Sequence, residues 1–306
     1  GSFQVIVGIW AAITGPFRGE RGGTTVFKHV VISMTRMFFD HASIEQLRYV
    51  QTSTLRTWRY LFPSKGAENA YRTLMHSRNL KPNIIELDNN TKAFWFGDPE
   101  AEKLIIYIPG GAYCIPALPA HFDFVDALQR NLEKHGQRSG VLFLSYDLAP
   151  RYKWPRQLEQ AVSLLRYATE TLGKRSSNII IQGDSAGGHL ALALLSHLAQ
   201  PHPQSSVPRL SLGEDIRGVL LLSPWIDFGT DWKSFHTNAS KDSLSVRGLC
   251  LNAEQIFSNE KKDSYSHPLN APAGWWKSLP VKRIFVGVGG DEILLDSIVA
   301  LVQNIE

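Results

Sequence analysis

Short apolar runs alternate with longer amphipathic stretches along most of the chain beyond residue 100. A strand with one face in water would alternate apolar and polar residues, so these continuous runs are typical of strands buried on both faces. The stretches between them have the length and periodicity of helices. The pattern therefore predicts an α/β fold, with a mostly parallel central sheet and helices on both faces. The expected strands are 104–108, 141–145, 178–182, 219–222 and 284–288, and the expected helices are 122–135, 158–172, 188–195 and 293–302.

The first part of the chain has a different pattern. Residues 27–76 carry apolar side chains at helical spacing, and a turn then separates two short strands, 83–87 and 92–96. We expect these strands to form a hairpin that supplies an antiparallel edge to the sheet. This divides the chain into N-terminal helices over 1–82 and a core over 83–306. The apolar positions of the helices are Val30, Val31, Met34, Met37, Phe38, Leu55, Trp58, Leu61, Tyr71 and Leu74.

The alternation of strands and helices breaks between Pro224 and Pro280. This stretch is rich in Trp, Ser, Asn and Asp, and it is too long for a bare connection. We expect a small helical insertion at about 225–280 that folds over the C-terminal edge of the sheet. Together with the N-terminal helices it would form a cap over an apolar pocket. A peripheral surface insertion is the alternative.

The sequence Gly183-Asp184-Ser185-Ala186-Gly187 lies between an expected strand and an expected helix. The pattern G-x-S-x-G in this context is the nucleophile elbow of α/β-hydrolases, where a strained turn requires small residues around the serine. The hydroxyl projects above the sheet at a helix N-terminus, whose dipole favours developing negative charge. Ser185 is therefore the candidate nucleophile, and an ordinary strand-to-helix turn is the alternative.

A serine nucleophile needs backbone N–H groups that hold the oxyanion. The amide of Ala186 is one candidate, because it follows the nucleophile. The loop at 109–113 supplies the other candidates, Gly110, Gly111 and Ala112, since glycines let the backbone approach a bound carbonyl closely. If Ala112 has to adopt a positive φ, the cost is about 1 kcal/mol.

A catalytic triad also needs an acid and a base. Asp291 and Glu292 follow the last expected strand side by side, and either could orient a histidine. In this fold the chain order is Ser, acid, His, yet the last histidine, His267, precedes both acids. We expect either that a strand-plus-helix unit of about 30 residues with the histidine lies beyond residue 306, or that the protein dispenses with the base. His121, His189 and His267 are expected to be structural, with His189 packed against the oxyanion loop.

Several segments occur in an order that is specific when they are taken together: 110–113, 146–150, 183–188, 222–225 and 289–296. They resemble the hormone-sensitive-lipase-like branch of the α/β-hydrolases, particularly its fungal esterases and lipases. The resemblance implies a carboxylic-ester hydrolase fold with a helical cap, and its spacing of an acid four residues before Asp296 favours Glu292 as the acid. The loop departs from the family's usual His-Gly-Gly-Gly at Pro109 and Ala112, and Arg151 stands where the family has an acid.

The composition is that of an ordinary globular chain, with 43% hydrophobic residues, 20% charged residues and a net charge of +4. No Lys/Arg-rich tract is interleaved with aromatic residues, so we expect no nucleic-acid partner. Cys114 and Cys250 can form no disulfide framework and lack the spacing of metal ligands, so we expect no metal and no cofactor. Asn89 and Asn238 each begin an N-x-S/T triplet, a pattern that often arises by chance.

Residues 3–14 are strongly apolar and are followed by basic residues. The segment is too short to span a bilayer, which needs about 20 residues. It predicts either the end of a membrane anchor or interfacial helix, or a helix packed over a pocket. The expected location is the cytoplasm or the surface of a membrane, with the endoplasmic reticulum among the candidates. The basic residues are Arg18, Arg21, Lys28 and Arg36.

These features together predict a serine carboxylic-ester hydrolase that acts through an acyl-enzyme on Ser185. The aromatic residues of the expected cap indicate a hydrophobic acyl ester as the small-molecule substrate. Two alternatives use the same fold. One is a pseudoenzyme that binds a ligand, and the other is a lyase or cyclase of secondary metabolism.

Overall fold

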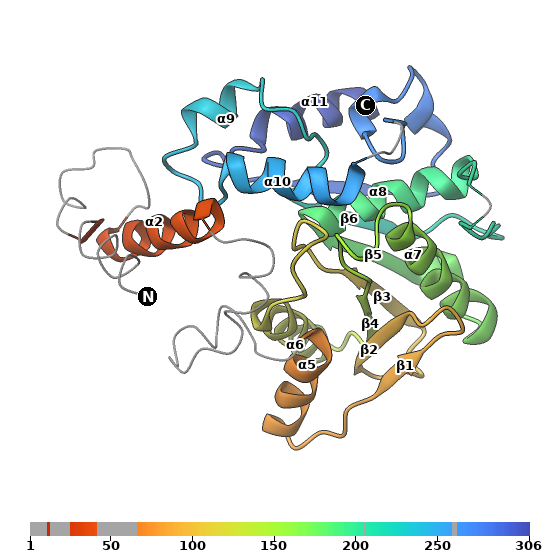
Figure 1. Cartoon of the computed structure of the whole chain (residues 1–306). Coiled ribbons are helices and arrows are strands. Elements are labelled where there is room, and N and C mark those ends of the chain that lie inside the picture. Colours follow the sequence, from red (N-terminus) through yellow and green to blue (C-terminus); the bar gives the residue numbers. More distant parts are fainter. Residues whose placement is uncertain (1–10, 13–24, 42–65, 205, 259–261) are drawn as a thin grey trace.

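The computed structural model describes residues 11–12, 25–41, 66–204, 206–258 and 262–306. Its centre is a seven-stranded sheet with the strand order β1-β2-β4-β3-β5-β6-β7 (Figure 1). The first strands form an antiparallel hairpin that also joins β4 in antiparallel fashion, and all other neighbours are parallel. The predicted α/β-hydrolase architecture is therefore confirmed. The strands are β1 (Ile84–Glu86), β2 (Lys92–Gly97), β3 (Lys103–Ile108), β4 (Ser139–Ser145), β5 (Ile179–Asp184), β6 (Gly218–Leu222) and β7 (Ile284–Gly287).

Successive residues of the strands enter two separate cores, one on each face of the sheet. In β4, Val141 and Phe143 belong to one core, and Leu142 and Leu144 belong to the other. Because both faces are covered, the strands carry apolar residues without interruption.

One face is covered by helices α5 (Gly66–Ser77) and α6 (Pro119–Lys134), and its core is aromatic. Phe122 of α6 stacks on Phe143 with ring centroids 4.5 Å apart, and Tyr71 of α5 stacks on Phe94 at 4.9 Å. The aromatic pairs fix the two helices against the hairpin half of the sheet.

The other face is covered by α7 (Arg156–Arg166), which ends in a π-helical turn at Tyr167–Thr171, and by α8 (Ala186–Ala199). Helix α8 contacts β3, β5 and β6 and packs against α7. Helix α8 is apolar on all sides because the sheet, α7 and the insertion enclose it.

The segment between β6 and β7 folds into short helices, as the sequence predicts (Figure 1). They include α9 (Lys233–Thr237), α10 (Val246–Phe257) and the 3₁₀ turns Pro268–Asn270 and Trp275–Ser278. Helix α2 (Val26–His41) lies against α10, and α11 (Leu295–Ile305) packs against α9 and both 3₁₀ turns. Helix α5, which belongs to the N-terminal helices predicted over 1–82, packs on a face of the sheet. The division into N-terminal helices, core and cap stays a prediction.

The helix predicted around Leu55, Trp58 and Leu61 lies outside the described residues, and so does most of the apolar segment 3–14. In the part of the chain that the structure describes, no helix combines the length and the apolar character needed to cross a bilayer.

Tyr71 anchors α5 to the hairpin through its hydroxyl, which donates to the Trp95 carbonyl at 2.6 Å and accepts from the Asn83 N–H at 3.0 Å. We expect Tyr71→Phe to lower the free energy of unfolding by about 1–3 kcal/mol, because the buried Trp95 carbonyl and the part-buried Asn83 N–H both lose a partner. Urea denaturation measures the change. Tyr167→Phe is the control, since that hydroxyl has no hydrogen-bond partner among the described residues, and an equal loss in both variants would contradict the expectation.

Candidate active site

Ser185 occupies the junction of β5 and α8 with φ 49° and ψ −120°, a strained backbone conformation. Its N–H donates to the Leu222 carbonyl at 2.9 Å, which ties the turn to the neighbouring strand β6. The flanking glycines leave no room for a side chain. A Cβ on Gly183 would lie 2.3 Å from the Gly187 carbonyl oxygen, and a Cβ on Gly187 would lie 2.0 Å from that of Ile108. The turn therefore has the geometry expected of a nucleophile elbow.

The loop after β3 runs directly over this turn. A Cβ on Gly110 would lie 2.4 Å from Asp184 Oδ2 and 3.1 Å from Ser185 Cβ. Beyond it, Gly111, Ala112 and Tyr113 all have positive φ, at 127°, 49° and 60°. The positive φ considered for Ala112 in the sequence is present, and Tyr113 adds a second residue in the same strained region.

Of the backbone N–H groups around Ser185, one already donates a hydrogen bond within the protein and others do not. The N–H of Gly110 donates to the carboxylate of Asp184, so it is not available to a substrate. Among the described residues, the N–H groups of Gly111 and Ala112 have no acceptor. Ala186 begins helix α8, and its N–H therefore has no partner within the helix.

His121 and Asp184 join helix α6 to the elbow. His121 Nδ1 accepts from the Leu118 N–H at 2.9 Å, so the proton of the neutral ring is on Nε2, which lies 3.3 Å from Asp184 Oδ2. Tyr107 donates to the other carboxylate oxygen at 2.7 Å. Burial opposes ionisation of Asp184, but the hydrogen bonds that its carboxylate accepts from His121, Tyr107 and the Gly110 N–H outweigh burial and lower its pKa.

His189 joins α8, the loop after β3 and the insertion. Its Nε2 lies 2.9 Å from the Ser266 carbonyl, which can only accept, so the proton is on Nε2 and Nδ1 accepts from the Tyr113 hydroxyl. Burial lowers the pKa of His189 to about 4, so the ring is neutral near pH 7. The ring thus packs against the loop at 109–113, as predicted from the sequence.

No histidine among the described residues forms a hydrogen bond with Ser185. His267 Nδ1 lies 3.0 Å from Ser266 Oγ, and its ring packs against Phe228 with centroids 5.0 Å apart. His121, His189 and His267 are thus each held by other partners, in agreement with the structural roles expected of them.

The two candidate acids point in different directions. Glu292 is half-buried, and its Oε1 accepts from the Ser223 hydroxyl and from the Gly289 N–H, each at 2.8 Å. Ser223 follows β6, and its N–H donates to Gly287 at the end of β7, so Glu292 lies at the same edge of the sheet as the elbow. Asp291 is exposed and pairs with Lys241 at 3.0 Å.

A polar network supports the loop after β3 from behind, and the sequence did not predict it. The Tyr146 hydroxyl donates to the Pro109 carbonyl at 2.8 Å, and the Ala149 N–H donates to the Tyr113 carbonyl at 2.9 Å. These two bonds make residues 146–149 a platform for the loop. The motif at 146–150 was visible in the sequence, but its contact with the loop was not.

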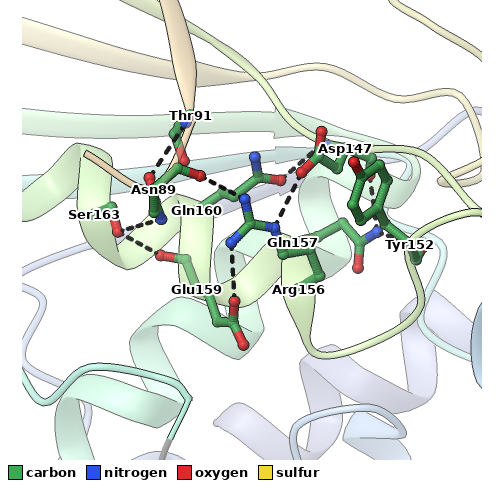
Figure 2. Close-up of polar contacts among 9 residues, drawn as sticks. All are labelled: Asn89, Thr91, Asp147, Tyr152, Arg156, Gln157, Glu159, Gln160 and Ser163. Atoms are coloured by element: carbon green, nitrogen blue, oxygen red, sulfur yellow. Dashed lines mark hydrogen bonds and ion pairs between the residues drawn. The ribbon is translucent and has the colours of Figure 1, made fainter. Parts of the chain in front are cut away.

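Arg156 of α7 holds that platform in place (Figure 2). Its guanidinium reaches Asp147 at 3.0 Å, Glu159 at 3.1 Å and the Asn89 carbonyl at 2.5 Å. The Asp147 N–H donates to Gln160 at 2.7 Å. By contrast, Arg151, which stands where the family has an acid, is exposed. Its guanidinium lies over the ring of Tyr152.

A cavity of about 320 Å³ lies between the oxyanion loop, this platform and the start of α5. Its wall is mixed, with apolar residues on the loop and Arg151 at the rim. The described residues contain no group of three or more His, Cys, Asp or Glu side chains that could hold a metal ion. The lining includes Pro109, Ile115, Ala117, Tyr146, Leu148 and Tyr152.

The fold and the site agree with a comparison against known families. Residues 105–306 match the sequence profile of a family with the alpha/beta hydrolase fold. The chain belongs to the α/β-hydrolase family. Among solved structures it is similar to an esterase from the bacterial hormone-sensitive lipase family, with a TM-score of 0.62 and 26% identity over 86% of this chain and 82% of that one. A fungal esterase structure from Rhizomucor miehei shares the fold at a TM-score of 0.61 and 20% identity, over 74% of this chain and 68% of that one.

Curated relatives of this α/β-hydrolase are named for ester hydrolysis. Steryl acetyl hydrolase 1 of Saccharomyces cerevisiae is 24% identical over 64% of this chain and 46% of its own length. An esterase of Acinetobacter venetianus is 31% identical over 64% of this chain and 59% of its own length. The chain spans about half the length of these two relatives. The resemblance to the hormone-sensitive-lipase-like branch is therefore confirmed.

The neutral His189 makes the stability of this α/β-hydrolase depend on pH. Because the folded state lowers the pKa of His189 to about 4, its contribution is complete above the unfolded value of about 6.5 and is lost as the pH falls toward 4. We expect this to remove about 3 kcal/mol from the free energy of unfolding, measured by urea denaturation from pH 8 to pH 4. His189→Gln should flatten this part of the profile, whereas His76→Gln, on an exposed residue of α5, should not. Equal profiles for wild type and His189→Gln would contradict the assignment.

Proposed function

We propose that the protein is a serine carboxylic-ester hydrolase that acts on a hydrophobic acyl ester. The observation that carries the proposal is the strained Ser185 directly beneath a strained loop whose N–H groups are free. Two strained segments in contact are costly, at about 1–3 kcal/mol for each strained residue, and such strain concentrates at functional sites.

In the proposed reaction, Ser185 Oγ attacks the ester carbonyl carbon and loses its proton to a histidine base. The N–H groups of Gly111, Ala112 and Ala186 hold the carbonyl oxygen as it becomes negative. The tetrahedral intermediate expels the alcohol, which takes the proton from the histidine. A water molecule then attacks the acyl-enzyme by the same route and releases the carboxylic acid.

Glu292 is the acid in this proposal. A carboxylate that orients an imidazole must lie at the sheet edge near the nucleophile, and Glu292 is tied there through Ser223. Asp291 is the weaker candidate, because it is exposed and engaged with Lys241.

In the chain order of the fold, the base is a histidine that follows the acid. β7 is the edge strand of the described sheet, and the side chain of its Phe285 is 62% exposed. A hydrogen-bonding edge and an apolar side chain are thus available beside Glu292 for a further strand to cover. The greater length of the curated relatives fits the same idea.

A hydrophobic substrate fits the aromatic side chains that the insertion brings toward the site. Phe228 and Phe257 pack together with ring centroids 4.5 Å apart, and both contact His189. The names of two relatives, a steryl acetyl hydrolase and an arylacetamide deacetylase, point to acyl groups on bulky apolar partners. We infer an ester of a hydrophobic alcohol or acid as the substrate class.

The proposal includes contact with a membrane surface through the N-terminal region. At the start of α2 the side chains of Val26, Phe27 and Val31 are 38%, 76% and 39% exposed, beside the basic Lys28. Apolar residues next to a cation suit the interface of a bilayer.

A second candidate function is a protein that binds a hydrophobic ligand on the same fold. It is favoured by one observation, that no histidine of the described residues reaches Ser185. In that case the strained elbow and loop would hold a ligand carbonyl without reacting with it.

Hydrolysis of a p-nitrophenyl ester separates the two functions. We expect the protein expressed from its complete gene to hydrolyse p-nitrophenyl butyrate, and Ser185→Ala to reduce kcat/KM by at least about 10³-fold, since the nucleophile is lost. Glu292→Gln should cost about 10³- to 10⁴-fold, and its neighbour Asp291→Asn should cost little. An inactive wild type, or an active Ser185→Ala, would reject the serine esterase.

A further inference from the structure

The loop that carries Glu292 is held by side chains of the β6–β7 insertion. Asn238 Nδ2 donates to the carbonyl of Glu292 itself at 2.9 Å and to that of Gly290 at 3.3 Å. Asp242 Oδ2 accepts from the Ile293 N–H at 2.8 Å. The backbone on both sides of the Glu292 side chain is therefore fixed from the insertion.

A third contact closes the other end of the same loop. The Ser234 N–H donates to Asp296 Oδ2 at 2.7 Å, and the Ser234 hydroxyl donates to the Ile293 carbonyl at 2.7 Å. The Asp296 N–H in turn points to Ser234 Oγ at 3.2 Å. Asp296, which the family spacing links to the acid, thus serves to attach α9 to the loop.

The three insertion residues are themselves buried. Ser234, Asn238 and Asp242 are only 2%, 6% and 8% exposed. Within the loop, the Glu292 N–H donates to the Gly289 carbonyl at 3.2 Å, and the Leu295 N–H donates to the Glu292 carbonyl at 3.4 Å. The hydrogen bonds inside the loop are therefore long. Buried backbone groups require partners, and for the fully buried Ile293 the insertion supplies one to the N–H and one to the carbonyl. The burial also makes the Asn238 triplet unsuitable for a glycan.

Ser234, Asn238 and Asp242 together form a clamp on the loop of Glu292. This clamp extends to the N-terminal helix α2. The Asp242 side chain also accepts from the Leu244 N–H at 2.9 Å, which fixes its orientation. The Asp242 carbonyl accepts from Arg36 Nε at 3.0 Å and from Nη2 at 2.5 Å. Helix α2 and the loop of Glu292 therefore contact the same residue, Asp242.

We propose that Asn238 and Asp242 are positioning residues that set the place of Glu292, so that the acid is aligned only when the insertion and α2 are seated. The role in catalysis rests on the proposed function, whereas the mechanical clamp does not. The clamp makes the insertion part of the machinery that orients the acid, in addition to its place over the site.

Amide hydrogen exchange and kinetics test the two parts separately. In Asp242→Asn an amide group faces the Ile293 N–H in place of a carboxylate, and we expect the amides of 289–296 to exchange at least about tenfold faster. In the protein from the complete gene, kcat should fall by about 10²-fold with little change in KM, because the acid is misplaced while the substrate site is intact. The acidic limb of the pH–rate profile should move to lower pH, because a histidine without its carboxylate has a lower pKa. Asn238→Ala is a milder second variant with the same expected directions.

Asp227→Asn is the matched control, because Asp227 is an insertion carboxylate that accepts from Gly229 and Trp232 and does not touch the loop. It should speed exchange near 227–232 alone. Unchanged exchange at 289–296 in both clamp variants would overturn the clamp. Faster exchange with unchanged kcat and pH profile would overturn the positioning role. An inactive wild type would reject the proposed esterase, and the exchange data would still decide the clamp.

Discussion

Three backbone segments meet at Ser185 with no space for side chains between them. The end of β5, the start of α8 and the loop after β3 approach so closely that Gly110, Gly183 and Gly187 each exclude a Cβ. This contact forces positive φ at Ser185, and the same crowded loop has positive φ at Ala112 and Tyr113. Each of these three residues costs about 1–3 kcal/mol, which the surroundings have to offset.

The offset comes from polar contacts that attach to the strained segments from several sides. Asp184 holds Gly110, the platform at 146–149 holds Pro109 and Tyr113, and His189 holds the Tyr113 side chain. His189 can do this only as a neutral ring, because its two nitrogens must donate and accept at the same time. The insertion reaches the site through the same ring and, separately, through the loop of Glu292. Ser185, the loop above it and the loop of Glu292 therefore depend on elements far from them in the sequence.

The sequence predicted the structure well wherever a local pattern of residues determines it. Continuous apolar runs located every long strand, because both faces of the sheet are covered, and the glycines around Ser185 revealed the elbow. Arg156, Asn238 and Asp242 could not be found in this way, because the contacts that tie them to the platform, to the loop of Glu292 and to α2 join residues 9 to 206 positions apart and follow no period. Asp291 and Glu292 are adjacent carboxylates, so only the path of the backbone distinguishes them. The expected helix near Leu55 and the apolar segment 3–14 remain predictions.

The central claim is that the elbow presents Ser185 as a reactive nucleophile. A fluorophosphonate probe, which reacts with activated serines, tests it on the protein from the complete gene. We expect one adduct, located by mass spectrometry at Ser185 in the tryptic peptide 176–209 and absent after mild unfolding in urea. An adduct on a different serine, or a folded protein that the probe leaves unlabelled, would contradict it.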